Sequence, residues 1–295
     1  MTTTRPIPVI LDTDIGSDID DTWALATLLC CPELELKLVT TATSEPAERA
    51  KIVCRVLEAG GRSDVPVGVG LPVVNQEIRH GEWTAGYDLR RYAGGVREDG
   101  VGAMIETILA SPTDVTLVCI GPLPNIAEAL RREPRIAART HFVGMHGSVF
   151  RGYGGSAQPS KEWNVVSDPA SCRRVFEAPW ASVTLTPLDT CGLVRLRGGK
   201  YAAVRASRRP LAQAIVDNYD LWRRGGPDEG ASSILFDTVA VYLAFARDLL
   251  TMQRIGLRVT DDGFTVPDPA APPMDVAVDW KNLDAFEDWL VERLT

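Results

Sequence analysis

The chain has 295 residues, of which 45% are hydrophobic and 24% are charged, and its formal net charge is −8. This composition is typical of a soluble globular protein, and a negative charge without a basic run argues against non-specific binding to nucleic acid, whose phosphates require a basic surface. No stretch approaches the roughly 20 apolar residues of a membrane helix. Residues 1–8 also lack an apolar core of signal-peptide length. We therefore expect a cytoplasmic protein that binds neither membranes nor nucleic acid.

The six cysteines form no C-x-x-C pair, and most of them lie among apolar residues. They are Cys30, Cys31, Cys54, Cys119, Cys172 and Cys191. This pattern favours buried free thiols in a reducing cytoplasm over a disulfide framework.

Short apolar runs alternate with segments of helical spacing along the chain. The runs predicted to be strands are residues 8–11, 36–41, 65–69, 115–120, 141–145 and 182–186. The predicted helices are residues 22–29, 47–59, 104–110, 125–131 and 169–176. Strands that alternate with helices predict an α/β fold, with a mostly parallel, Rossmann-like open sheet and helices on both of its faces. In such sheets the ligand binds beyond the carboxyl ends of the strands.

The rest of the chain contains no repeat, low-complexity tract or linker, so we expect a single domain that spans residues 1–295. The glycine-rich residues 147–160 are expected to form a loop at the mouth of the site. Residues 207–235 are expected to contain a helix, a loop at 225–230 and the start of a further helix.

Five carboxylates lie within ten residues, at the end of the first predicted strand. They are Asp12, Asp14, Asp18, Asp20 and Asp21. A solvated acidic turn is one explanation, since helix N-termini favour acidic residues. The cluster follows a buried strand, however, where five negative charges are costly unless a cation or bound protons offset them. Ligands that are all oxygens favour a hard cation, Ca²⁺ or Mg²⁺, and we therefore predict a metal site.

Two known patterns explain this segment less well. An EF-hand loop follows a helix, and it needs a glutamate where the chain has Trp23. A phosphatase with Asp12 as nucleophile and Asp14 as acid remains an alternative. Its D-x-D pattern is short, and the Ile15-Gly16 that follows departs from the residues usual in such enzymes.

Residues 12–24 resemble the signature D-x-D-P-G-x-D-D-x-x-A of the inosine–uridine-preferring nucleoside hydrolase family, with two additional residues before Asp20. Further segments resemble family motifs in the same order. They are residues 39–45, 80–81, 120–127, 159–164 and 236–237. The matches extend from residue 9 to about residue 245. The resemblance implies the nucleoside hydrolase fold and an N-glycosyl hydrolase that cuts a ribonucleoside into free base and ribose.

The resemblance also implies a set of metal ligands. Asp14, Asp21 and Asp237 would bind Ca²⁺ through their side chains, and Ile120 would bind it through its main-chain carbonyl. Every residue has a main-chain carbonyl oxygen, so an isoleucine can bind a metal through its main chain. Ca²⁺ would position a water molecule and lower its pKa.

Asp20 would be the general base that takes a proton from this water, and Glu162 and Asn164 would hold ribose hydroxyls. The reaction would pass through an oxocarbenium-like ribosyl cation, which the surrounding carboxylates stabilise. The two additional residues could instead make Asp18 the base, although the spacing within the signature favours Asp20 and places Asp18 beside the substrate. Asp12 is expected to support the ligands without binding the metal itself.

Several positions concern the leaving base. Phe236 replaces a histidine that protonates the base in family members with a broad substrate range. Purine-selective members carry an aromatic residue there, which stacks on the base, so Phe236 indicates a purine preference; a plain core residue is equally compatible with the sequence. His80 is a candidate leaving-group acid or base contact. His146 is a candidate pocket residue, and Trp83 a candidate base contact that is more typical of packing.

Two departures concern the sugar. Ser156 stands where the family has an asparagine that contacts the ribose 5′-hydroxyl, and Glu45 replaces an amide or aspartate near the ribose. Both are candidate substrate-binding residues, and both suggest a modified N-riboside as an alternative substrate. A non-catalytic nucleoside-binding protein is a further alternative, although binding alone requires no base beside a metal-held water. The resemblance also implies a role in purine metabolism and a homodimer or homotetramer.

Overall fold

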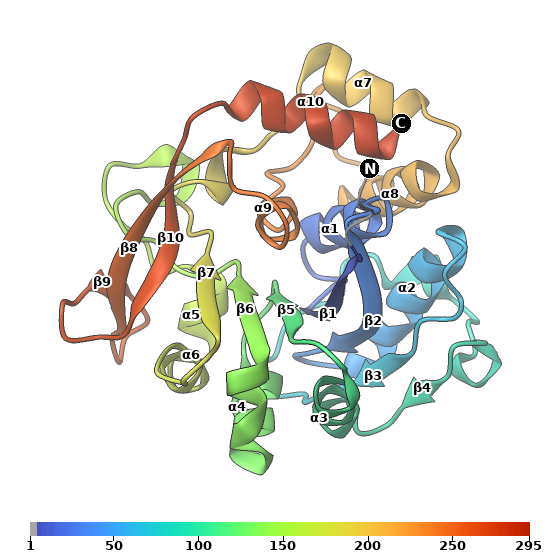
Figure 1. Cartoon of the computed structure of the whole chain (residues 1–295). Helices are drawn as coiled ribbons and strands as arrows, with labels where there is room; N and C mark the ends of the chain where they lie inside the picture. The colour runs from blue at the N-terminus through green and yellow to red at the C-terminus, as the bar shows by residue number, and fades with distance from the viewer. Residues whose placement is uncertain (1–4) are drawn as a thin grey trace.

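The computed structural model describes residues 5–295, and a single sheet of ten strands runs through this part of the chain (Figure 1). In order across the sheet the strands are β4 (Val96–Arg97), β3 (Val67–Val69), β2 (Leu34–Thr41), β1 (Ile7–Thr13), β5 (Val115–Cys119), β6 (Thr140–Gly144), β7 (Ser182–Leu185), β10 (Pro273–Trp280), β8 (Leu250–Val259) and β9 (Thr265–Pro267). The strands from β4 to β10 are parallel to their neighbours, whereas β8 and β9 add two antiparallel strands at one edge. The predicted mostly parallel sheet is confirmed.

The central strands are buried on both faces, which is why they are continuous apolar runs in the sequence. In β1, Val9, Ile10 and Leu11 have no exposed surface, and all five residues of β5 are buried. Asp12 of β1 pairs with Thr40 of β2 and with Cys119 of β5. The carboxyl ends of these three strands therefore lie together on one edge of the sheet.

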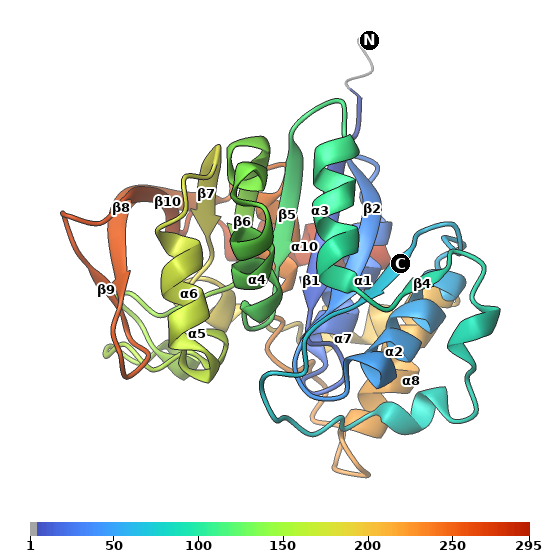
Figure 2. The same ribbon diagram turned by 90° about the horizontal axis from the view of Figure 1, so that it is seen from below.

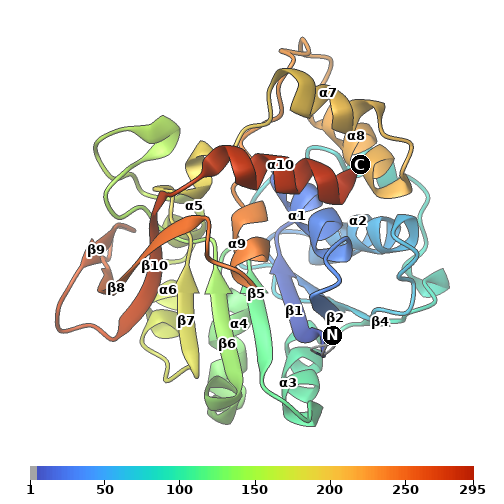
Figure 3. The same ribbon diagram turned by 45° about the horizontal axis from the view of Figure 1, so that its top comes forward.

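Helices cover both faces of the sheet. One face carries α3 (Gly100–Ala110), α4 (Pro124–Arg132), α5 (Trp163–Ser167) and α6 (Pro169–Phe176), of which α3, α4 and α6 lie side by side in Figure 2. The other face carries α1 (Asp20–Leu29), α2 (Pro46–Ala59), α8 (Pro210–Trp222) and α9 (Thr238–Leu243). Two further helices, α7 (Gly198–Ala206) and α10 (Leu283–Leu294), form an outer layer over α1 and α8 (Figure 3). Each face of the sheet has its own hydrophobic cluster.

Short 3₁₀ turns complete the connections. They are η1 (Gly81–Thr84), η2 (Leu89–Arg91), η3 (Pro134–Arg139), η4 (Tyr153–Gly155) and η5 (Cys191–Leu193).

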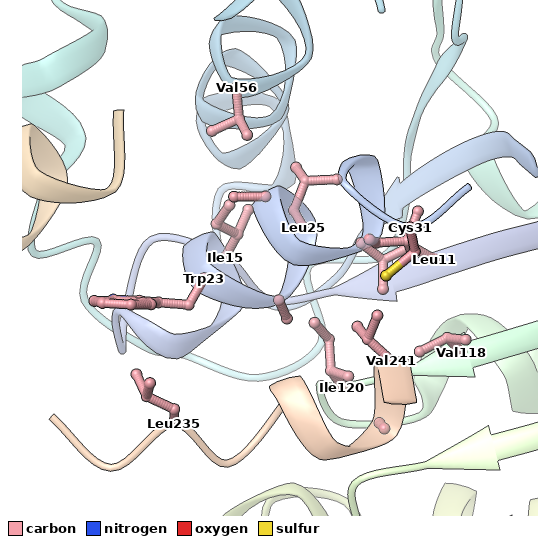
Figure 4. Packing of buried hydrophobic residues seen from close by; sticks show 14 of the residues in the cluster. Leu11, Ile15, Trp23, Leu25, Cys31, Val56, Val118, Ile120, Leu235 and Val241 are labelled. Carbon is pink, nitrogen blue, oxygen red and sulfur yellow. The ribbon is translucent and has the colours of Figure 1, made fainter. Parts of the chain in front are cut away.

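The core around α1 fixes the start of that helix. Trp23 and Leu25 of α1 are buried and pack in one cluster with Leu235 and Val241, from the segment that contains α9 (Figure 4). Ile15, from the loop between β1 and α1, is also fully buried in this cluster. Burial of large apolar side chains on both sides of residues 16–20 holds this acidic loop in one position.

Some segments differ from the expectation. Trp222 ends α8, and the next helix begins only at Thr238, so residues 231–235 contain no helix although a helix start was expected there. In residues 5–295 all six cysteines are free, as predicted, and Cys30 alone among them is only half-buried. In the same part of the chain, no helix combines the length and apolarity needed to cross a bilayer.

Candidate active site

A cavity of about 330 Å³ opens at the carboxyl ends of β1 and β5. The chain leaves β1 toward β2 on one side and returns later to β5 on the other, so these two strands flank the topological switch point, where open α/β sheets bind ligands. The charged and polar residues that line it are Asp14, Ser17, Asp18, Asp20, Asp21, Gln76, Glu77, Arg79, Glu162, Asn164 and Asp237. The remaining lining residues are Ile120, Met145, Tyr153, Trp163, Trp222 and Phe236.

The buried carboxylates come from the ends of three elements. Asp14 follows the last residue of β1, Asp20 and Asp21 begin α1, and Asp237 directly precedes α9. Asp20, Asp21 and Asp237 each place one carboxylate oxygen within 4.8 Å of the others. The N-termini of α1 and α9 therefore meet at the cluster, and their helix dipoles partly offset its negative charge.

The carboxylates strongly oppose one another's ionisation. Burial raises the pKa of Asp14 to about 6, and burial raises the pKa values of Asp20, Asp21 and Asp237 well above their usual range. Repulsion from neighbouring carboxylates raises the pKa values of Asp20, Asp21 and Asp237 further, and repulsion from Asp18 raises the pKa of Asp14. Thr13 donates a hydrogen bond to Asp21. A bound cation would offset this repulsion, and these oxygen donors suit a hard divalent cation.

Asp12 lies behind the cavity and does not line it. Its carboxylate accepts hydrogen bonds from Thr40 and, at 2.8 Å, from the Asn125 side chain. Burial raises the pKa of Asp12 to about 7. Asp12 therefore links β1, β2 and α4 just below the acidic loop.

Arg49 of α2 is fully buried and holds the acidic loop from behind. Its guanidinium donates to the main-chain carbonyls of Asp14 and Ile15 and, at 2.9 Å, to the Ser17 hydroxyl. The sequence reasoning missed this residue. The signal was its spacing, because Arg49 lies three and four residues before Ile52 and Val53, on the helix face that packs into the core.

Ile120 directly follows β5, and its carbonyl accepts a hydrogen bond of 3.2 Å from the Asn164 amide. The same amide donates to the carbonyl of Met145 at 3.0 Å. Gly121 makes this arrangement possible, because a Cβ atom at position 121 would lie 2.7 Å from Oδ1 of Asp14. The loop after β5 can therefore pass directly beside the carboxylate of Asp14.

Glu162 is anchored by main-chain donors. Its carboxylate accepts hydrogen bonds from the N–H groups of Gly147, Asn164 and Val165, at 2.9, 2.7 and 3.2 Å. Burial raises its pKa to about 7. Glu162 thus fixes the end of the 147–160 loop against α5, and this loop lies at the mouth of the cavity as expected.

Aromatic residues form the outer part of the cavity. Phe236 is half-buried and meets Tyr153 edge to face, with ring centroids 6.2 Å apart. Trp222, the last residue of α8, stacks on Tyr219 with centroids 5.8 Å apart. The sequence reasoning considered Phe236 but missed Tyr153 and Trp222, because nothing local to either residue indicated a site.

The sequence model of a family described as inosine-uridine preferring nucleoside hydrolase matches residues 9–288. The chain belongs to this family. Similar curated proteins include the "Non-specific ribonucleoside hydrolase RihC" of Salmonella paratyphi B and of Escherichia coli, each 28% identical over 98% of both chains. The predicted class of enzyme, a nucleoside hydrolase, is thereby confirmed.

Solved structures agree with the fold of this nucleoside hydrolase. A plant nucleoside hydrolase superposes with a TM-score of 0.83 at 22% identity, covering 99% of both chains. A purine-preferring ribonucleoside hydrolase from Gardnerella vaginalis superposes with a TM-score of 0.80 at 24% identity, covering 97% of this chain and 98% of the other. The predicted nucleoside hydrolase fold is confirmed.

The cavity of this nucleoside hydrolase brings together most of the residues singled out from the sequence. They are Asp14, Asp18, Asp20, Asp21, Ile120, Glu162, Asn164, Phe236 and Asp237. Asp18 is exposed at the rim and accepts a hydrogen bond from the N–H of Ile19, whereas Asp20 is buried. The additional residues of the acidic loop therefore bulge toward the cavity entrance.

Five other candidates lie outside the cavity lining. His80 is buried, and its Nδ1 lies 2.7 Å from the side-chain oxygen of Asn218 in α8. His146 is buried on the α6 side of the sheet, with Nε2 3.0 Å from the carbonyl of Gly121. Trp83 packs under Arg55, whose guanidinium carbon lies 4.2 Å from the ring centre.

The two remaining candidates are exposed. Glu45 has a left-handed backbone with φ of 51° and directly precedes α2. Ser156 lies in the 147–160 loop and accepts a hydrogen bond of 3.2 Å from the N–H of Gln158. Neither side chain faces the cavity in this conformation of the loops.

Proposed function

We propose that this enzyme hydrolyses the N-glycosidic bond of ribonucleosides with the help of Ca²⁺, and that it prefers purine bases. The observation that carries the proposal is a single cavity with buried carboxylates at its inner end and aromatic rings at its outer end. The inner end suits a cation and a ribose, and the outer end suits a flat base. The curated relatives named as ribonucleoside hydrolases support ribose as the sugar.

Asp14, Asp21 and Asp237 would hold the cation with their side chains, together with the carbonyl of Ile120. Burial and mutual repulsion raise the pKa values of these carboxyl groups, which is the pattern expected where a bound cation offsets negative charge. Their hard oxygen donors favour Ca²⁺ or Mg²⁺ over softer metals. When bound, Ca²⁺ would orient a water molecule and lower its pKa.

Asp20 would take the proton from the attacking water, since it is buried beside Asp21 and Asp237 while Asp18 is exposed at the rim. Glu162 and Asn164 would hold the ribose hydroxyls. As the bond to the base breaks, positive charge develops on the ribose ring, and the fixed carboxylates stabilise it. These groups need little reorganisation, because helix starts and main-chain hydrogen bonds already fix them.

The purine preference rests on the aromatic groups of the outer cavity. Phe236 would stack on the base, and it cannot protonate it. A larger purine ring gains more contact between Phe236 and Trp222 than a pyrimidine does. A purine ring also delocalises the negative charge of the departing base over more atoms.

Release of free base from purine and pyrimidine ribonucleosides, with and without a chelator, tests this function. We expect release that the chelator abolishes and added Ca²⁺ restores, with purine substrates cleaved faster. Equal rates for the two classes would refute the purine preference. Cleavage that resists the chelator would refute the role of Ca²⁺.

Two matched variants test the assignment of the base. Asp20→Asn should lose turnover, by roughly 10²-fold or more, and keep its affinity for Ca²⁺ in a calorimetric titration. Asp21→Asn should lose Ca²⁺ affinity. If Asp20→Asn weakened Ca²⁺ binding as strongly as Asp21→Asn, Asp20 would be a metal ligand and another group would be the base.

The same measurements address the two alternatives. Cleavage of a modified N-riboside but not of ordinary nucleosides would favour an altered substrate, and tight nucleoside binding without cleavage would favour a binding protein. We further infer a cytoplasmic enzyme that assembles as a homodimer or homotetramer, as the family resemblance implies. Sedimentation of the purified protein measures its assembly.

A further inference from the structure

A positively charged side chain, that of Arg79, lies at the outer end of the cavity. Among the described residues that line the cavity, Arg79 alone carries a positive charge. Its main-chain N–H donates to the carbonyl of Gly16 at 2.7 Å, and its guanidinium carbon lies 4.8 Å from the ring centre of Trp222. The Trp222 indole in turn donates to the carbonyl of Ser17 at 3.2 Å. The arginine and its aromatic platform are therefore both attached to the acidic loop.

The guanidinium of Arg79 acts on the rim carboxylate of Asp18 only at longer range, where partial desolvation raises the pKa of Asp18 and the positive charge of Arg79 lowers it in part. Neighbouring arginines form ion pairs, Arg224 with Glu77 and Arg223 with Asp220. In residues 5–295, by contrast, the guanidinium of Arg79 has neither an ion-pair partner nor a hydrogen-bond acceptor. Its five N–H donors remain free to face a ligand in the cavity, and a guanidinium stacked on an aromatic ring keeps a defined orientation.

The departing base needs such a group. The expected leaving-group position holds Phe236, which has no proton to give. His80 is buried, with its two ring nitrogens directed at Asn218 and at the carbonyl of Asp18. Tyr153 is a further donor near the outer cavity, and its hydroxyl already accepts a hydrogen bond of 2.9 Å from the N–H of Trp163.

We propose that Arg79 stabilises the negative charge of the departing base and selects bases that present two acceptors on one edge. This inference rests on the proposed function. The bond between C1′ and the base nitrogen breaks, and its electron pair remains on the base. The attacking water gives its hydroxyl to C1′ and its proton to Asp20, while the base later takes a proton from solvent. Arg79 keeps its own protons throughout, because a guanidinium does not deprotonate in a protein.

The edge that fits best belongs to a 6-oxopurine. Its O6 and N7 are adjacent acceptors, which a guanidinium binds with two parallel hydrogen bonds. Adenine presents a donor amino group beside N7, so only one of these bonds can form. Arg79 therefore predicts a preference for inosine and guanosine over adenosine.

The experiment compares inosine, adenosine and p-nitrophenyl β-D-riboside as substrates of the calcium-loaded enzyme. Nitrophenolate is stable as an anion and needs no help to leave, so this substrate reports ribose binding and water attack alone. We expect Arg79→Gln to lower kcat/KM for inosine by about 10²-fold, to lower it less for adenosine, and to leave it unchanged for the nitrophenyl riboside. Arg135→Gln, at an exposed arginine far from the cavity, should match the wild type on all three.

Other outcomes overturn the proposal. Equal losses on inosine and the nitrophenyl riboside would mean that Arg79 only maintains the site, and no loss on inosine would mean that it has no role. A loss on inosine in Tyr153→Phe but not in Arg79→Gln would assign leaving-group activation to Tyr153. If the wild type cleaved the nitrophenyl riboside but no natural nucleoside, the proposed role of Arg79 would be refuted and the proposed hydrolytic site would still be supported. If it cleaved none of the three substrates, the proposed function would fail as well.

Discussion

His146 gives a quantitative prediction for the pH dependence of folding. It lies under the sheet between Phe142 and Phe176, with ring centroids 6.0 and 6.4 Å away. Its Nε2 lies 3.0 Å from the carbonyl of Gly121, and its Nδ1 is buried without a partner. Burial lowers the pKa of His146 from 6.5 to about 4, so the folded protein keeps this ring neutral.

The size of the effect follows from proton linkage. Between pH 6.5 and pH 4 the unfolded chain binds a proton at His146 and the folded protein does not, so this histidine makes stability fall as the pH falls. With pKa values of 6.5 and about 4, the loss at pH 5 is about 2 kcal/mol. At pH 7 both states are neutral, and the hydrogen bond to Gly121 contributes about 1 kcal/mol.

The assay is urea unfolding of the wild type and of His146→Gln at pH 7 and pH 5, with saturating Ca²⁺ at both values. The variant should be about 1 kcal/mol less stable than the wild type at pH 7 and about 1 kcal/mol more stable at pH 5. His141→Gln, at the other end of β6, controls for the loss of a histidine. If the free energy of unfolding depended on pH in the same way in the wild type and in His146→Gln, the assignment of a neutral buried ring would be refuted.

Three further perturbations test the acidic loop. Arg49→Met removes the donor to the carbonyls of Asp14 and Ile15, so urea unfolding should show a free energy of unfolding lower by roughly 3 kcal/mol. A decrease below about 1 kcal/mol would show that Arg49 does not hold the acidic loop in place. Gly121→Ala places a Cβ atom 2.7 Å from Oδ1 of Asp14, so calorimetry should show Ca²⁺ affinity at least tenfold weaker, and unchanged affinity would exclude this contact. The chelated protein should lose thermal stability as the pH rises from about 4, the ordinary pKa of an aspartate, because burial raises the pKa values of Asp20, Asp21 and Asp237 and these carboxyl groups then ionise only at the cost of folding; bound Ca²⁺ should reduce this slope.

The sequence predicted the parallel part of the sheet well, for a physical reason. Strands such as β1 and β5 are buried on both faces, so each must be an apolar run, and each run is followed by a helix of clear periodicity. The last three strands of the chain, β8, β9 and β10, were not foreseen. Most of β8 is half-buried or exposed, and β10 mixes Asp275 and Asp279 with apolar residues, so neither strand forms the apolar run by which the others were found.

Part of the inner end of the cavity was predictable because its residues are close in the sequence, whereas Asp237 was identified only through the family resemblance. Asp14, Asp20 and Asp21 lie within eight positions, and one strand end and one helix start bring them together. The outer end was not predictable, because Arg79 and Trp222 are far apart in the sequence and meet only through the loop that both contact. No pattern in either segment indicates that meeting.

His80 lies differently from the position that its local pattern suggests. Its His-Gly dipeptide resembles a family motif, yet the ring is buried against Asn218 of α8. The neighbouring Arg79 lies on the cavity side of the same segment. The polar side chain that lines the cavity is therefore one position away from the one that the motif suggested.

The distribution of charge in the cavity matches the reaction proposed for it. When an N-glycosidic bond breaks, positive charge grows on the ribose and negative charge on the base. In the proposed arrangement buried carboxylates would surround the ribose, and Arg79, the one positively charged residue among the described residues of the lining, would lie where the base leaves. Because main-chain hydrogen bonds and aromatic contacts hold both sets of groups, the field is in place before the bond breaks, and little energy is spent on reorganisation. A site built only to bind a neutral nucleoside would gain nothing from this separation of charge.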